Sequence, residues 1–160
     1  MGIKASFTNS SLDNYFAQVL QIAKEETTRT LSYLGEQCIA RIRNRSGEES
    51  WFDRTGNLRS SIGYGVFEHG KKQIESTFAQ VLGGTEGSAK GRAYVEQLAQ
   101  QYADTYALIV VAGMDYAEIV EALDNKDVLA STELWAKQEI ERYMTITKYR
   151  IEKRVRKLEL

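Results

Sequence analysis

The sequence of 160 residues contains no proline, one cysteine and one histidine. Without proline, the chain has no residue that must kink or stop a helix, so long helices are permitted. The single thiol, Cys38, cannot form an intrachain disulfide, which indicates a reducing compartment. The single histidine, His69, has no cysteine or second histidine beside it, so we predict a solvated loop residue there. We therefore expect no zinc site, no histidine-assisted nucleophile and no cofactor.

A strong net charge and a long apolar run are also missing. The formal net charge is -1, so any binding to nucleic acid or acidic membrane would need a local patch. No apolar run approaches the roughly 20 residues of a membrane-spanning helix, and residues 1–14 lack the apolar core of a secretory signal. We therefore expect no membrane contact. A hydrophobic content of 42% fits a single folded domain over residues 1–160.

Two long helices are predicted from apolar residues at helical spacing. The first runs from about Ser11 to about Arg45, with a polar interval at residues 24–30 where the apolar stripe weakens and a bend would fit. It would be on the order of 50 Å long, more than the core of a small domain needs. The second is capped by Ser131 or Thr132 and ends in a basic helical extension over residues 148–160, which contains Lys148, Arg150, Lys153, Arg154, Arg156 and Lys157.

Between these helices the sequence predicts a small sheet. Thr55-Gly56-Asn57 forms a turn pattern, and the strand after it carries its bulk at alternate positions, Ile62, Tyr64 and Val66. Residues 106–111, YALIVV, predict a second strand that pairs with the first. Residues 116–121 fit a strand or a helix equally well. The expected class is therefore α+β, a small antiparallel sheet packed against two long helices.

A glycine-rich stretch over residues 79–91 predicts a flexible loop. Its residues Gly83 to Gly91 match neither the phosphate-binding spacing GxxxxGK[ST] nor the dinucleotide pattern GxGxxG. We therefore do not expect a phosphate site, and we predict that the loop orders only on assembly. A short amphipathic helix over residues 93–102 should follow it.

Catalytic residues are not distinguished by any motif, so we expect no enzyme and no small-molecule substrate. Two alternatives remain. A small enzyme would have to use carboxylates such as Asp115 or Glu121. A nucleic-acid-binding module would use Arg41, Arg43, Arg45 and the basic C-terminal helix, although the three arginines also suit the negative end of the first helix dipole.

Two short motifs carry a resemblance to a known family. The chain resembles the tailed-phage HK97 gp10-like family of tail-completion or head-tail joining proteins. The family is similar in its order of parts, which is a long helix, a TGxLRxSI-type turn into a strand, a second strand, a YAxxVE segment and a C-terminal helix. The likeness spans roughly residues 12–146, but Ala122-Leu123-Asp124 stands where many members have glycine and threonine. The motif residues are Thr55, Gly56, Asn57, Leu58, Arg59, Ser61 and Ile62, then Tyr116, Ala117, Val120 and Glu121.

The resemblance implies a non-enzymatic structural subunit of a phage or prophage virion. Such a subunit would form a homo-oligomeric ring at the neck or the head-proximal end of the tail and would contact other neck or tail proteins. It would be found in the cytoplasm of a bacterial host during assembly and then in the virion. A closed ring of identical subunits needs different patches of the same subunit to face each other.

Overall fold

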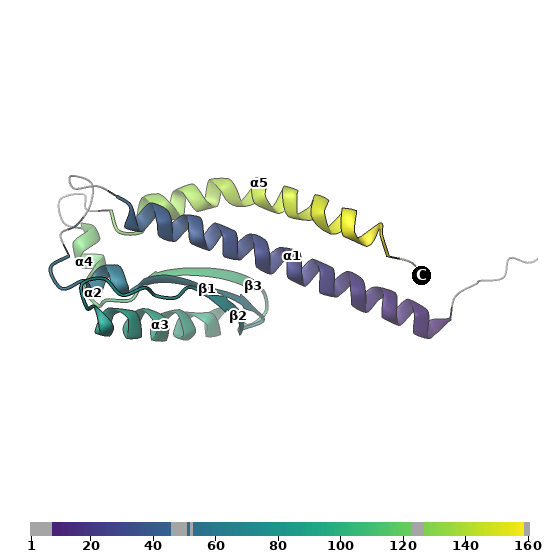
Figure 1. The fold of residues 1–160 in the computed structure, drawn as a ribbon, viewed down its shortest axis with the longest axis horizontal. Helices are drawn as coiled ribbons and strands as arrows, with labels where there is room; N and C mark the ends of the chain where they lie inside the picture. The colour runs from purple at the N-terminus through teal and green to yellow at the C-terminus, as the bar shows by residue number, and fades with distance from the viewer. Residues whose placement is uncertain (1–7, 46–50, 52, 123–126, 159–160) are drawn as a thin grey trace, which may run out of the picture.

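The computed structural model describes residues 8–45, 51, 53–122 and 127–158, and it confirms the predicted α+β class. A three-stranded antiparallel sheet lies between helix α3 on one face and the long helix α1 on the other, and helix α5 packs along α1 (Figure 1). None of the helices in the described part of the chain has both the length and the apolar character to cross a membrane. The elements are α1 (Asn9–Arg43), α2 (Asn57–Ser60), β1 (Ile62–Glu68), β2 (Lys71–Glu75), α3 (Thr85–Ala99), the 3₁₀ helix η1 (Gln100–Tyr102), β3 (Tyr106–Ala112), α4 (Ala117–Ala122) and α5 (Ala130–Val155).

The sheet has the strand order β2-β1-β3, so β1 is central and both neighbours are edge strands. The predicted pairing of the two apolar strands is confirmed, with Ile62 opposite Ala112 at one end and Glu68 opposite Tyr106 at the other. A tight turn joins β1 to β2, and its residues His69 and Gly70 both have positive φ. His69 is exposed there, as predicted.

The alternation along β1 turns Tyr64 toward one face of the sheet and Gly63 toward the other. Tyr64 faces α1, where its ring fills the space beside Gly35 and its hydroxyl bonds Ser32 and Glu36 at 2.9 Å each. Gly63 faces α3, and the ring of Phe78 occupies the space that a side chain would take there. The sheet therefore has a buried core on each face, one under α1 and one under α3.

The prediction of a flexible loop over residues 79–91 is wrong for most of its length. Residues from Thr85 onward form α3, which ends at Ala99 rather than spanning residues 93–102. Gly87 and Gly91 lie on its buried face, and a Cβ on Gly91 would be 2.3 Å from the carbonyl oxygen of Ser61. These glycines allow α3 to approach α2 and β1 closely, so they serve packing and not mobility.

Helix α1 is continuous through the polar interval at residues 24–30, where α5 lies alongside it (Figure 1). Buried Thr30 and Thr147 share a 2.5 Å hydrogen bond across the two helices. Arg154 of α5 binds Glu25 at 2.7 Å and the buried Glu26 at 3.0 Å. The weak apolar stripe thus marks the place where the helix pair is joined by polar contacts.

The start of α1 and the end of α5 project together beyond the sheet and α3 (Figure 1). With 35 residues, α1 is about 52 Å long, whereas a seven-residue strand spans about 23 Å. We call this part, residues 9–20 of α1 and 148–155 of α5, the projecting helix pair.

Candidate functional site

The two family-like motifs lie next to each other around the start of the sheet. Burial raises the pKa of the Tyr116 hydroxyl, the Asp53 carboxylate raises it further and the Thr55 side chain lowers it, so Tyr116 lies close to the turn. The Asn57 side chain accepts a 3.2 Å hydrogen bond from the backbone N–H of Gly87. Gly56 has a φ of +74°, and a Cβ there would overlap the backbone of Val81. The turn therefore connects the segments that precede β1 to both α3 and α4.

Most other motif residues are inside the molecule or hold helix ends. Leu58, Ser61 and Ile62 are at most 1% exposed, and Ala117 also belongs to the core, with Val120 packed against it. The N–H of Arg59 donates to Asp53 at 2.8 Å, and its guanidinium donates to the carbonyl of Arg43 at 2.8 Å. A short helix, α2, separates the turn from β1, which the sequence did not predict.

The second motif is helical, and its last residue caps α5. A carboxylate oxygen of Glu121 accepts hydrogen bonds from the N–H groups of Leu129 and Ala130 at 3.0 and 2.6 Å. The N-terminal N–H groups of a helix lack partners within the helix, so this carboxylate stabilises the start of α5. Asp115 is mostly exposed and pairs with Lys90 at 2.9 Å. Both carboxylates named for the enzyme alternative thus have partners within the fold.

The three arginines near the end of α1 are bound within the molecule. Arg43 donates to the carbonyl of Ile62 at 2.7 Å, and the Arg41 guanidinium lies 4.6 Å from the ring centre of Trp135. Arg45 pairs with Asp127 at 2.9 Å and also binds the hydroxyls at the start of α5. These contacts connect α1 to the sheet and to α5 and occupy Arg43 and Arg45. The nucleic-acid alternative keeps Arg41, which is itself exposed, and the exposed residues Lys148, Arg150, Lys153, Arg156 and Lys157.

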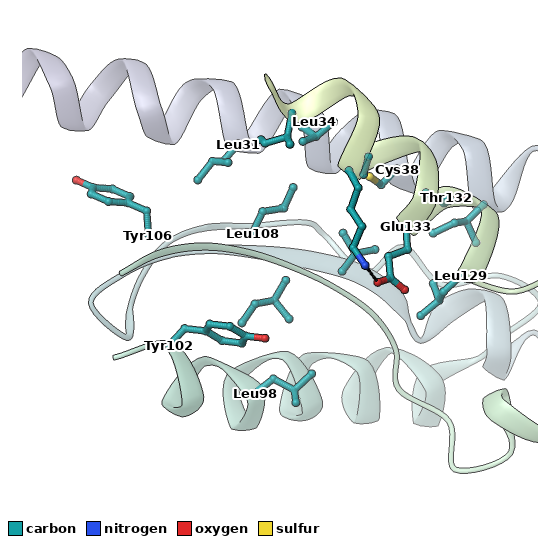
Figure 2. A pocket seen from close by; sticks show the side chains of 16 residues that line it. Leu31, Leu34, Cys38, Leu98, Tyr102, Tyr106, Leu108, Leu129, Thr132 and Glu133 are labelled. Carbon is teal, nitrogen blue, oxygen red and sulfur yellow. Dashed lines mark hydrogen bonds and ion pairs between the residues drawn. The ribbon is translucent and has the colours of Figure 1, made fainter. Parts of the chain in front are cut away.

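An apolar groove of about 550 Å³ runs along β3, and the sequence did not predict it (Figure 2). Its floor is β3 itself, its α1 side includes Leu31, Leu34 and Cys38, and the start of α5 forms a further wall. On the opposite side of the strand Leu98 and Tyr102 continue the lining (Figure 2). The groove therefore follows the edge of β3, with apolar walls from both faces of the sheet.

The groups that line this groove are neutral or paired. Burial raises the pKa of the Cys38 thiol to about 11. Burial and a 2.6 Å hydrogen bond to Glu68 raise the pKa of the Tyr106 hydroxyl to about 12. Glu133 and Lys137 form an ion pair at the rim, 2.5 Å apart. A charged ligand would find no unpaired opposite charge in this groove. An apolar segment of polypeptide would instead find apolar walls to pack against.

Metal-ligating side chains do not gather anywhere in residues 8–45, 51, 53–122 and 127–158. No group of three or more histidine, cysteine, aspartate or glutamate side chains in those ranges is placed to hold a metal ion.

Comparisons with protein-family models, with curated proteins and with solved structures gave no match. The resemblance to the phage family therefore depends on the two motifs and the order of the elements.

Proposed function

We propose that the protein is a structural subunit of a tailed-phage or prophage virion, a tail-completion or head-tail joining protein that assembles into a ring. The phage assignment is supported by the two motifs and by an element order like that of the HK97 gp10-like family. The assembly is supported by one structural observation, the helix pair that projects beyond the domain with large apolar side chains exposed.

The exposed apolar residues of the projecting helix pair lie on both helices. On α1, Phe16 is 58% exposed and Leu20, one helical turn later, is 70% exposed. On α5, Tyr149 is 64% exposed. Large exposed side chains on each helix favour burial against another subunit, because each buried apolar residue contributes about 1.5–3 kcal/mol. The groove along β3 is a second, separate apolar surface, so unlike patches are present, as a closed ring needs.

The solution mass of the purified chain tests self-assembly. Light scattering over a concentration series should give a mass of several subunits, or one that rises with concentration. Phe16→Glu/Leu20→Glu should lower this mass, because two charges would have to be buried in the contact. Ala17→Glu/Gln18→Glu adds two carboxylates to exposed positions of the same helix turns and serves as the matched control. A strict monomer at every concentration would contradict self-assembly of the chain.

The phage assignment has its own test. Particles purified from a host that produces them should contain the protein at a fixed ratio to the other neck or tail proteins, measured by quantitative mass spectrometry. Absence from such particles would contradict a role as a virion subunit, whatever the solution mass shows.

A further inference from the structure

Within the described part of the chain, the outer edge of strand β3 is unpaired, and it lies in the apolar groove. The N–H of Gly113 donates to the carbonyl of Ser61, and the N–H of His69 donates to the carbonyl of Thr105. These two bonds show which residues of β3 direct their backbone groups toward β1. In an antiparallel pair, residues alternate between facing the partner strand and facing away from it. The backbone groups of Tyr106, Leu108 and Val110 therefore point away from β1, toward the groove.

No strand covers this edge among the described residues, since β3 pairs only with β1. Edge strands that stay unpaired are usually protected by charge or proline. The opposite edge strand, β2, fits that rule with Lys71 and Lys72, but β3 has the sequence YALIVVA with no charged residue. Leu108 and Val110 are only half-buried. The edge is therefore suited to accept another extended segment, with apolar walls on both sides of it.

The chain itself contains a segment with the pattern of such a strand. Residues 1–7 lie outside the described residues, so only their sequence enters here. It reads MGIKASF, with apolar residues at positions 1, 3, 5 and 7 and with Gly2, Lys4 and Ser6 between them. This strict alternation is the pattern of a strand with one apolar face. Its seven residues match the length of β3.

This segment cannot lie along the groove of its own subunit with both Ile3 and Phe7 inside it. Leu31 is the α1 residue of the groove that lies nearest to Asn9, and it is roughly 33 Å farther along the helix axis, at 1.5 Å per residue. Phe7 is only two residues before Asn9 and therefore stays within about 7 Å of it, so Phe7 cannot enter the groove of its own subunit. A second copy of the chain has no such restriction.

We propose that residues Met1–Phe7 of one subunit add to the free edge of β3 in a neighbouring subunit, with Ile3 and Phe7 inside the apolar groove. The inference deepens the proposed function, because it assumes the self-assembly described above and names a contact that joins the subunits. The donated segment and the accepting groove are different surfaces, so the contact is heterologous and suits a ring. The backbone supplies affinity and the alternating side chains supply register.

The first test places charge on the segment in the full-length chain. Ile3→Asp/Phe7→Asp should raise the concentration at which the oligomer dissociates by about tenfold or more, which corresponds to about 1.4 kcal/mol. Gly2→Asp/Ser6→Asp adds the same charge on the other face of the segment and should change that concentration much less. Equal effects of the two pairs, or no effect of either on an oligomer that does form, would overturn the inference and leave self-assembly standing.

The second test blocks the accepting edge. Val110→Pro removes an N–H that points away from β1, so it keeps the hydrogen bonds between β1 and β3. The variant should weaken assembly as strongly as Ile3→Asp/Phe7→Asp does. Circular dichroism confirms that the variant is folded. Ile109→Pro removes an N–H that faces β1 and should unfold the sheet instead. Assembly of a folded Val110→Pro variant at wild-type concentrations would overturn the inference.

A peptide experiment separates this inference from the proposed function. A labelled peptide MGIKASF should bind the Ile3→Asp/Phe7→Asp protein and protect the amides of Leu108 and Val110 from hydrogen exchange, whereas a peptide of scrambled order should not. If the full chain is monomeric although the peptide binds, the edge of β3 accepts the segment, but self-assembly fails and the proposed contact between subunits fails with it. If the peptide does not bind and protects neither amide, the groove inference fails.

Discussion

Replacing Gly91 by alanine sets two physical effects against each other. In an exposed helix interior, alanine is more favourable than glycine by about 1 kcal/mol because the unfolded chain loses less freedom. Gly91, however, is on the buried face of α3. A Cβ there would lie 2.3 Å from the Ser61 carbonyl oxygen and 2.8 Å from the ring of Phe78.

The magnitude follows from those distances. An ordinary contact begins near 3.4 Å, so α3 would have to move away from Ser61 by about 1 Å, and the obstacle is backbone that a rotamer change cannot relieve. Overpacking of this kind costs up to about 3 kcal/mol. After subtracting the gain in helix propensity, we expect Gly91→Ala to lower the free energy of unfolding by about 2 kcal/mol. For a chain of this size that corresponds to a fall in Tm of about 4–8 °C.

Urea and thermal unfolding followed by circular dichroism measure the effect. Ala89→Gly is the matched control, because Ala89 is exposed in the same helix and its change removes only propensity, at a cost of about 1 kcal/mol. Gly91→Ala should therefore be the more destabilising of the two. An increase in Tm for Gly91→Ala would refute the close packing of α3 and would restore the flexible-loop interpretation of residues 79–91.

Three further predictions concern groups whose roles the structure defines. The pKa of Cys38 is about 11 in the folded state against an ordinary 9.0, so folding favours the protonated thiol. The stability of the protein relative to Cys38→Ala should therefore be constant below pH 9 and fall by at most about 2.7 kcal/mol between pH 9 and 11. Urea titrations across this pH range measure the difference. Glu121→Ala should cost about 1 kcal/mol through loss of the α5 cap, whereas Glu121→Gln, which still has an accepting oxygen, should cost less in thermal unfolding; equal costs would contradict a capping role. Thr147→Val should lower the free energy of unfolding by about 1–3 kcal/mol, because it leaves the buried Thr30 hydroxyl without its partner. In a double-mutant cycle, Thr30→Val/Thr147→Val should lower the free energy of unfolding by less than the two single changes added together.

Local patterns in the sequence determined the regular elements with the strongest periodicity. Apolar spacing located α1 and α5, since a stripe every three to four residues has to face other apolar groups wherever the helix packs. Alternation in Ile62, Tyr64 and Val66 located β1 and the face that carries these side chains, and the run over residues 106–111 located β3. Pairing of β1 with β3 followed because no other predicted strand was as apolar.

The tertiary structure decided what the small residues and the charged residues do. Gly87 and Gly91 are compatible with a loop or with a closely packed helix, and only the approach of α2 and β1 selects the helix. Glu121 could not be recognised as a helix cap, because it lies eight residues before the first N–H that it binds. The groove beside β3 depends on which edge of the sheet stays unpaired, a property of strand order that no local pattern encodes. Short-range periodicity therefore determined the elements, whereas contacts between residues distant in sequence determined the surfaces available to a partner.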